Sequence, residues 1–403
     1  MKNHRIVAPI FAVLSAMALA ACAKGSTGVP GGSGGAGGEG GSWTQASSSG
    51  NGGPGGAGGG GAGGGGGSGG APQAFWVVRL GDGAAPLTGA AAPVFLDRRL
   101  TDGTEQAAPI ALPAVAQGSN NPFTISGSAT SEGNLALSAN GKFVTLAGYA
   151  ATVGFAAVSS SQALTVPRTV ARVDAAGNAD TTTRVDGAFN VSNVRGAVTS
   201  DGTAYWVSGN SISGSGGVHH VSHGATSGTQ VLSVPINVRF VDIAGGQLYG
   251  SSGTGTFVNV FTVGSGLPTT PSQTATTLPG MPTADASPYA FALLDRSQAV
   301  AGVDTLYVAD DRAPASGGGI QKWQFDGAQW SLAATWNGGL ASGMRGLAAK
   351  VTGEVVVLVG TTAEASGNHV ITAVDDGSSS PALKVVATAA PNTIYRGVAF
   401  APQ

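Results

Sequence analysis

The chain has 403 residues, a formal net charge of −2 and only 10% charged residues. No basic stripe with interleaved aromatic residues occurs, so the composition excludes a nucleic-acid-binding role. Cys22 is the only cysteine in the chain, so no intramolecular disulfide can form.

Residues 1–21 have the three parts of an export signal. Lys2 and Arg5 make its start basic, an uncharged apolar stretch runs from Ile6 to Ala18, and small residues close it. The apolar stretch is shorter than the roughly 20 residues that cross a bilayer as a helix. We therefore expect residues 1–21 to be a signal peptide.

Cys22 stands directly after Leu19-Ala20-Ala21, and this tetrapeptide resembles the lipobox of bacterial lipoproteins. The resemblance implies that Cys22 is acylated and becomes the mature N-terminus, which attaches the chain to a membrane. Burial of the acyl CH₂ groups at about 0.8 kcal/mol each makes such an anchor stable. Ala23 follows instead of Asp, which favours the outer membrane of a Gram-negative cell, on its periplasmic or its surface side. The alternative is an ordinary cleaved signal with an incidental cysteine.

Residues 22–72 join the predicted lipid anchor to the rest of the chain. Glycine-rich runs such as 31–35 and 63–67 cannot bury apolar area, and glycine loses the most entropy on ordering. These residues predict a flexible linker, with an end-to-end distance on the order of 40 Å.

Residues 73–403 consist of short β-rich runs separated by turn signals that contain Gly, Asn or Asp. No segment carries a convincing helical apolar stripe. One kind of run is strongly apolar, at Phe75–Val78, Phe143–Leu146, Ala204–Val207, Gln247–Tyr249, Leu306–Val308 and Val355–Leu358. A second kind follows each of these, at Val94–Asp97, Val170–Val173, Val218–Val221, Val258–Phe261, Ile320–Trp323 and Val370–Val374. The fixed order indicates an internal repeat.

A third kind of run is small and apolar and precedes five of the strongly apolar runs. These runs are Leu135–Leu137, Gly196–Val198, Phe240–Val241, Phe291–Leu293 and Gly346–Ala348. The missing sixth run is found at the C-terminus, at Gly397–Phe400. A last strand that completes the first sheet closes a ring and leaves no long free edge. The sequence therefore predicts an all-β fold, a β-propeller of six blades. Seven blades stay open because residues 262–286 are irregular, and the alternative fold is a pair of β-sandwiches.

Two kinds of hairpin resemble known propeller families. Leu137-Ser-Ala-Asn-Gly141 and Val198-Thr-Ser-Asp-Gly202 are similar to the hairpins of YVTN and lactonase-type propellers, and Leu306–Asp310 with Gly319–Trp323 resembles an NHL repeat. In both hairpins Asn-Gly or Asp-Gly provides the positive φ of a tight turn. The resemblance implies the architecture and leaves the activity open, since no sialidase-type Asp box or quinone-binding tryptophan repeat is visible.

Arginine recurs immediately before the predicted inner strands. It fills four of six equivalent positions, as Arg195, Arg239, Arg345 and Arg396, and Asn134 and Tyr289 fill the other two. We expect these loops to meet at one mouth of the central channel, where four guanidiniums would suit a carboxylate or a phosphate. The alternative is that each arginine only ties its loop to carbonyl groups of a neighbouring blade.

Asp310 and Asp311 end a strongly apolar strand, and the loop that follows them should lie on the same rim as the arginines. They are candidates for ligand binding, for a catalytic base or for a calcium site, and no other cofactor is implied. We do not expect His219, His220 and His223 to form a metal site. On a strand His219 and His223 would lie about 13 Å apart along one face, and His220 would point to the other face.

These features favour a lipid-anchored, monomeric binding or scaffold module outside the cytoplasm. Its partners would be a small anionic ligand, a glycan or a protein of the cell envelope. A lactonase-like hydrolase or lyase is the first alternative, although no assembled catalytic set is visible and an enzyme is not favoured. A purely structural envelope protein is the second alternative.

Overall fold

The computed structural model describes residues 71–255, 257–378 and 380–403. The predicted signal peptide, Cys22 and nearly all of the predicted linker lie outside these residues. Within the described part, the regular structure is β-strand except for two short 3₁₀-helices, η1 (Val158–Ser160) and η2 (Pro314–Ser316). No helix in this part is both long and apolar enough to span a membrane.

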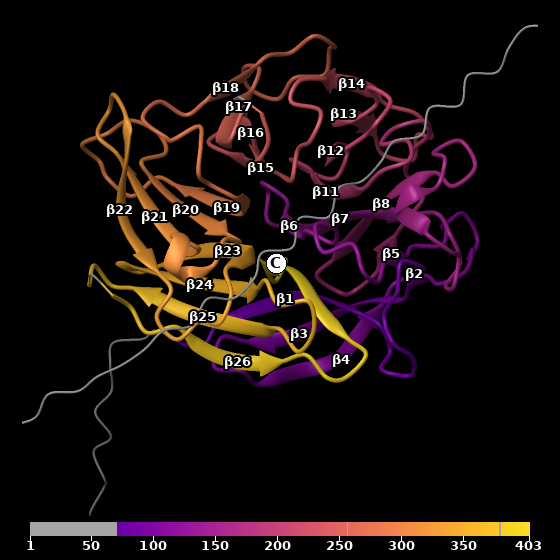
Figure 1. The fold of residues 1–403 in the computed structure, drawn as a ribbon, viewed down its shortest axis with the longest axis horizontal. Coiled ribbons are helices and arrows are strands. Elements are labelled where there is room, and N and C mark those ends of the chain that lie inside the picture. Colours follow the sequence, from indigo (N-terminus) through magenta and orange to yellow (C-terminus); the bar gives the residue numbers. More distant parts are fainter. Residues whose placement is uncertain (1–70, 256, 379) are drawn as a thin grey trace, which may run out of the picture. The chain divides into compact units, whose positions relative to one another are not determined.

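Six sheets are arranged radially around a central channel (Figure 1). Their innermost strands are β27 (Ile394–Phe400), β6 (Ala136–Leu137), β11 (Val194–Val198), β15 (Phe240–Ala244), β19 (Pro288–Leu294) and β23 (Met344–Thr352). The second strands are β1 (Ala74–Leu80), β7 (Phe143–Tyr149), β12 (Ala204–Gly209), β16 (Gln247–Ser252), β20 (Thr305–Asp310) and β24 (Val355–Thr362).

The third strands are β3 (Val94–Leu100), β8 (Arg168–Asp174), β13 (Gly217–Ser222), β17 (Asn259–Val263), β21 (Gly319–Phe325) and β25 (His369–Asp375). The outermost strands are β4 (Glu105–Ala111), β9 (Ala179–Asp180) with β10 (Arg184–Val185), β14 (Thr229–Leu232), β18 (Ala275–Thr277), β22 (Trp330–Trp336) and β26 (Lys384–Thr388). A small additional sheet pairs β2 (Ala91–Ala92) with β5 (Ile125–Ser126).

The C-terminal strand closes the ring. β27 pairs antiparallel with β1, with Phe400 opposite Phe75 and Val398 opposite Val77. The predicted six-bladed propeller and its C-terminal closing strand are therefore confirmed. A seventh blade and the pair of β-sandwiches are both wrong, because the irregular stretch 262–286 contains β18, the outer strand of the fourth blade.

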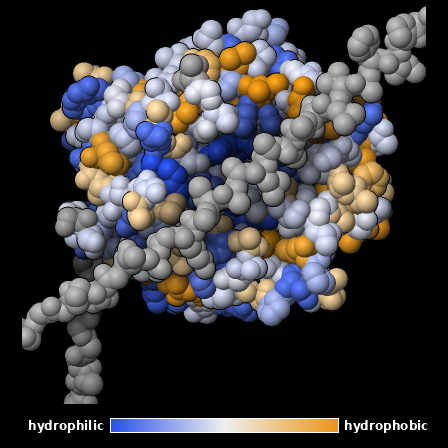
Figure 2. Space-filling model, viewed as in Figure 1, coloured by the Kyte–Doolittle hydropathy of each residue, from blue (hydrophilic) through white to orange (hydrophobic). Residues whose placement is uncertain are grey.

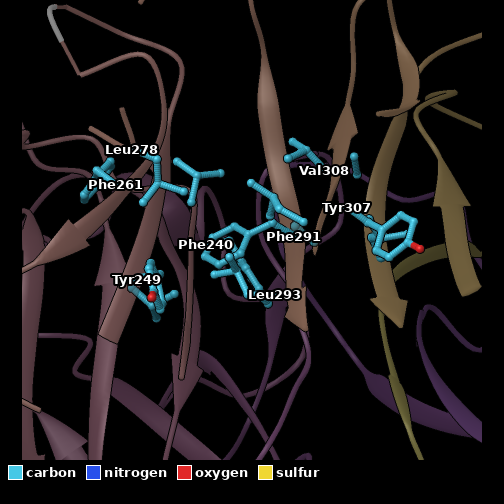
Figure 3. Close-up of a cluster of buried hydrophobic side chains, with 14 of the residues drawn as sticks. Phe240, Tyr249, Phe261, Leu278, Phe291, Leu293, Tyr307 and Val308 are labelled. Atoms are coloured by element: carbon cyan, nitrogen blue, oxygen red, sulfur yellow. The ribbon is translucent and has the colours of Figure 1, made fainter. Parts of the chain in front are cut away.

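The core fills the spaces between blades, because each sheet is covered on both faces by its neighbours. The second strands are accordingly buried along most of their length, as the predicted continuous apolar runs require. Phe240 and Phe291, on neighbouring inner strands, meet edge to face with ring centres 5.3 Å apart (Figure 3).

Hydroxyl groups on second strands join neighbouring blades. The Thr145 hydroxyl donates to the Ala197 carbonyl at 2.7 Å, and the Ser251 hydroxyl donates to the Tyr289 carbonyl at 2.7 Å. The Thr361 hydroxyl donates to the Arg396 carbonyl at 2.6 Å. In each case the acceptor belongs to the inner strand of the next blade, so these bonds hold the inner strands at fixed positions around the channel.

The antiparallel order gives the ring two distinct faces. Inner strands begin, second strands end and third strands begin on one face, which we call the mouth face. The β7–β8, β12–β13 and β20–β21 connections lie on this face. In the view of Figure 2, hydrophilic residues line the visible part of the central hollow and hydrophobic residues occur in small groups around the ring.

Candidate anion site at the channel mouth

The six equivalent positions that precede or begin the inner strands lie at the mouth-face end of the channel. Tyr289 stands between two of the arginines. Its ring centre is 4.4 Å from the guanidinium carbon of Arg239 and 5.1 Å from that of Arg345. Asn134 reaches across from another blade and donates from Nδ2 to the Arg239 carbonyl at 2.9 Å. The chain thus brings side chains from separate blades together at one end of the channel.

β-Bulges set the direction of the arginine side chains. The pairing of β11 with β12 shifts between Val194 and Gly196, and the pairing of β23 with β24 shifts between Met344 and Gly346. The residue within each shift is an arginine of the mouth. A bulge bends its strand and changes the direction of the side chain within it. Arg195 and Arg345 therefore owe their orientation to bulges at equivalent places in two blades.

Glycine follows three of the four arginines, and at two of these positions, Gly346 and Gly397, the backbone of the neighbouring blade is very close. A Cβ on Gly346 would lie 2.8 Å from the Arg396 carbonyl oxygen, and one on Gly397 would lie 2.6 Å from the Gly133 carbonyl oxygen. The Gly397 amide also donates to the Gly133 carbonyl at 2.9 Å. Two of the three Arg-Gly pairs therefore have a backbone without room for a Cβ, whereas a Cβ at Gly196 would meet its nearest atoms at 3.4 Å, an ordinary contact.

Arg345 and Arg239 have partners within the protein. Arg345 donates from Nε and Nη2 to Asp311 Oδ2 at 3.1 and 3.0 Å. Arg239 donates from Nη1 to the Ser287 hydroxyl at 2.8 Å and to the Pro288 carbonyl at 3.1 Å. The Pro288 carbonyl therefore accepts from Arg239, as expected if the arginines only tie their loops to a neighbouring blade. A carboxylate, Asp311, and a hydroxyl, Ser287, accept from these arginines as well.

Arg195 and Arg396 are more deeply buried, each 7% exposed. Arg195 donates from Nη1 to the Asn237 side-chain oxygen, and Arg396 has one long contact, 3.5 Å from Nη2 to the Gly127 carbonyl. The Nε atoms of both residues are buried without a hydrogen-bond partner. Burial lowers the pKa of each guanidinium to about 10, because the charged form loses water.

Glu132 is a buried acid beside the mouth that the sequence analysis missed. Its Oε1 accepts from the Tyr149 hydroxyl at 2.5 Å and from Asn193 Nδ2 at 2.6 Å, and its Oε2 accepts from the Ser126 amide at 3.0 Å. Burial raises the pKa of Glu132, and the charge of Arg396 opposes that rise. Its position two residues before Asn134 was the only signal available in the sequence.

Asp310 and Asp311 have different partners. Asp310 is fully buried, and its Oδ1 accepts from the Arg312 amide at 3.0 Å and from Arg312 Nε at 2.9 Å. Its Oδ2 accepts from the Ser287 amide at 2.9 Å. Asp310 thus holds two loops of the mouth face, whereas Asp311 pairs with Arg345.

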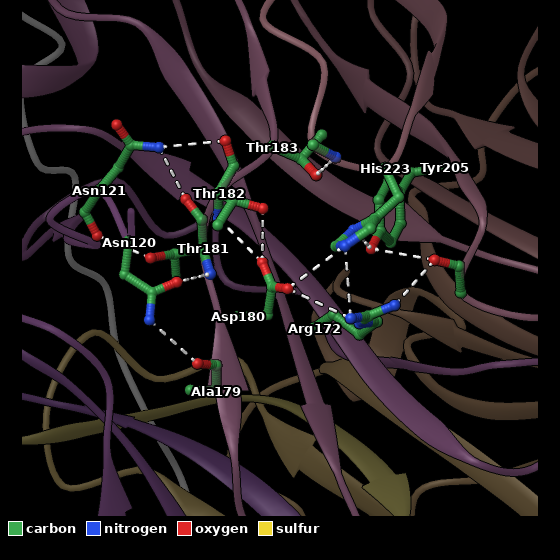
Figure 4. A network of polar contacts seen from close by, with 12 residues as sticks. Asn120, Asn121, Arg172, Ala179, Asp180, Thr181, Thr182, Thr183, Tyr205 and His223 are labelled. Atoms are coloured by element: carbon green, nitrogen blue, oxygen red, sulfur yellow. Dashed lines mark hydrogen bonds and ion pairs between the residues drawn. The ribbon is translucent and has the colours of Figure 1, made fainter. Parts of the chain in front are cut away.

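The three histidines each have partners of a different kind. His219 is buried, and burial lowers its pKa to about 4. The ring of His220 lies 5.3 Å from the Trp206 ring. His223 belongs to a polar network in which its Nε2 is 3.3 Å from Asp180 Oδ2 (Figure 4). Among residues 71–255, 257–378 and 380–403, no group of three or more His, Cys, Asp or Glu residues is arranged to hold a metal ion.

The space beside Arg396 is small, and Arg195 does not line it. A cavity of about 10 Å³ lies among Tyr289, Arg345, Arg396, Glu132 and Glu364, and this volume accommodates roughly one water-sized group. A wider part of the channel, about 220 Å³, follows along the inner strands.

A larger cavity, of about 560 Å³, lies between the fifth and sixth blades. Lys322 Nζ and Asp375 Oδ2 form an ion pair in its wall at 2.6 Å. The residues that line this cavity do not include the arginines of the mouth.

Comparisons with known proteins support no family assignment. No family model matches the chain, and no curated protein matches it. Among solved structures, the chain is similar to dihydro-heme d1 dehydrogenase NirN in complex with DHE, at 13% sequence identity and a TM-score of 0.35. The match covers 78% of this chain and 53% of that one, so the chain spans about half the length of this relative. The assignment of the propeller rests on the strand order and pairing of this chain.

Proposed function

We propose that this protein is a lipid-anchored binding module outside the cytoplasm, whose propeller binds the carboxylate or phosphate group of an anionic ligand at the mouth. The observation that carries the proposal is the pair of buried arginines, Arg195 and Arg396, whose Nε donors lack partners. A buried donor without a partner is costly, and an anion that accepts from it removes that cost.

The charge balance of the mouth supports an anion. Four guanidiniums lie there with three carboxylates. Asp311 pairs with Arg345, Glu132 acts electrostatically on Arg195 and Arg396, and Glu364 lines the same small cavity as Arg396. Charge-assisted bonds from arginine to carboxylate or phosphate are stronger than neutral ones. The small cavity admits one ligand oxygen to Arg396, so the rest of the ligand would remain outside the mouth.

The predicted lipobox supports the proposal that the protein is a lipoprotein anchored in the outer membrane. The test is incorporation of a labelled fatty acid in a bacterial host, followed by membrane fractionation. We expect the label on the parent chain and its loss in Cys22→Ser. Equal labelling of both chains, or none on the parent, would contradict the anchor.

Binding at the mouth is tested by calorimetric titration with inorganic phosphate and with succinate. We expect saturable binding to the parent chain and an affinity at least about tenfold lower in Arg396→Gln, because one charge-assisted bond is lost. Arg98→Gln is the matched control, since Arg98 is a surface arginine that bonds the Ala108 carbonyl. An equal loss of affinity in both variants would mean that only the net charge of the protein matters, and it would contradict the proposed site.

A further inference from the structure

Four exposed hydrophobic side chains lie on two connections of the mouth face, β7–β8 and β12–β13. Leu164 is 83% exposed and Ile212 is 76% exposed, and Val153 and Phe155 are also exposed. Val153, Phe155 and Leu164 belong to the β7–β8 connection, and Ile212 belongs to the β12–β13 connection. We call these four residues the apolar tips.

Asn190 joins the two connections that carry the apolar tips. Its Oδ1 accepts from the Ala163 amide at 2.8 Å, next to Leu164. Its main-chain carbonyl accepts from the Ser211 hydroxyl at 3.2 Å, next to Ile212. Leu164 and Ile212 therefore stand on either side of one hydrogen-bonded residue, and their exposure is a fixed feature of the loops.

The connections that carry the apolar tips, and the segment around Asn190, contain no formally charged residue. None of the residues in 150–167, 187–194 and 206–218 is Asp, Glu, Lys or Arg. Such loops can enter an apolar medium without dehydrating an ionised side chain. Charged residues in the loops would make this transfer costly. Isolated side chains that project from loops also suit a fluid lipid phase better than a rigid protein partner, which needs a matching pocket for each.

We propose that the apolar tips insert into the interface of a lipid bilayer and place the mouth face of the propeller against the membrane. This inference rests on the proposed function, because the proposed lipid anchor is what places the protein at a membrane. The predicted linker would enter the propeller at β1, which begins on the face opposite the mouth. Its expected end-to-end distance, on the order of 40 Å, would still let the tips reach the bilayer that holds the predicted anchor, so weak insertion would be sufficient.

The test is co-sedimentation of the full chain carrying Cys22→Ser with phosphatidylcholine vesicles. This chain has no acyl group, so its binding reports on the domain alone. We expect binding that is insensitive to salt, because the tips and their loops are uncharged. The further substitutions Leu164→Ser and Ile212→Ser should each lower the partition coefficient at least about tenfold.

The matched control carries Leu332→Ser and Val385→Ser, which replace exposed residues on the outer strands β22 and β26. We expect this control to bind vesicles like the chain with Cys22→Ser alone. Failure of that chain to bind, or equal losses in the control and in the tip variants, would overturn the inference. Self-association without vesicles that the tip variants abolish would also overturn it, because the surface would then bind a second copy.

Phosphate titration of the tip variants separates this inference from the proposed function. We expect the affinity for phosphate to be unchanged in them. If phosphate binds but vesicles do not, the membrane contact is wrong and the anion site stands. If vesicles bind but phosphate does not, the anion site is wrong and the membrane contact stands.

Discussion

At the scale of single residues, the main feature of the mouth is its buried guanidinium groups, which have too few hydrogen-bond partners for all of their donors. Arg195 and Arg396 are the clearest cases, since each is buried and each keeps a donor without a partner. The sequence could predict the position of these arginines from their place before each inner strand. It could not predict their burial or the neighbouring Glu132, because both depend on how separate blades meet.

Glu132 should make anion binding depend on pH. Burial raises its pKa, so as the pH falls through that raised value the carboxylate is neutralised and the positive charge of the mouth grows. We therefore expect the affinity for succinate to rise as the pH is lowered towards this pKa. Glu132→Gln should bind more tightly than the parent at neutral pH and lose this pH dependence. If the variant kept the pH profile of the parent, the charge of Glu132 would have no effect on anion binding, which would contradict this prediction.

Asp242 should make the stability of the fold depend on pH. Burial raises its pKa from 3.8 to about 7, so the folded state holds a proton that the unfolded state releases. Its contribution to stability is therefore present at low pH and is lost as the pH rises from about 4 towards 7. At pH values above this range we expect Asp242→Asn to raise the free energy of unfolding by roughly 1–2 kcal/mol, less than the full shift implies because Asp242 as a whole is only partly buried. Denaturant unfolding at several pH values measures this, and a variant with the parent's pH profile would contradict it.

At the scale of elements, the inner strands explain how repetition in sequence becomes a site. The bulges in β11 and β23 redirect arginines at equivalent places, and Gly346, after the second bulge, lies where the neighbouring inner strand leaves no room for a Cβ. The period and polarity of the runs were sufficient to predict the strands and the closing role of β27. They were insufficient to predict the bulges, because a bulge depends on register against the neighbouring strand.

Gly397 tests the close approach of the inner strands. A Cβ there would lie 2.6 Å from the Gly133 carbonyl oxygen, against backbone that cannot move aside without disturbing the neighbouring blade. We expect Gly397→Ala to lower the free energy of unfolding by about 2 kcal/mol or more. Gly338→Ala is the control, since a Cβ at Gly338 would meet no atom within 4 Å. Denaturant unfolding that shows equal, small effects in both variants would contradict the close packing.

At the scale of the whole molecule, ring closure gives the chain a rigid mouth without a disulfide. The C-terminal β27 pairs with the N-terminal β1, so no inner strand is left as a free edge. The same closure puts residues far apart in sequence, such as Arg195 and Arg396, into one electrostatic environment that includes Tyr289 and Glu132. A ring of this kind supports many functions, so the argument for anion binding depends on the mouth and not on the fold.

The most direct test of the anion site is NMR observation of the arginine Nε–H groups during titration with phosphate. Arg195→Lys and Arg396→Lys identify the two signals, and the Nε–H of surface residue Arg98 provides the control. We predict a saturable shift of the Arg396 signal, as a phosphate oxygen in the small cavity accepts from a donor that has no partner in the free protein. We predict a smaller saturable shift of the Arg195 signal, because the phosphate charge would lie in the electrostatic environment that the two arginines share. Signals that stay in place, or that move only as much as that of Arg98, would contradict the proposed site.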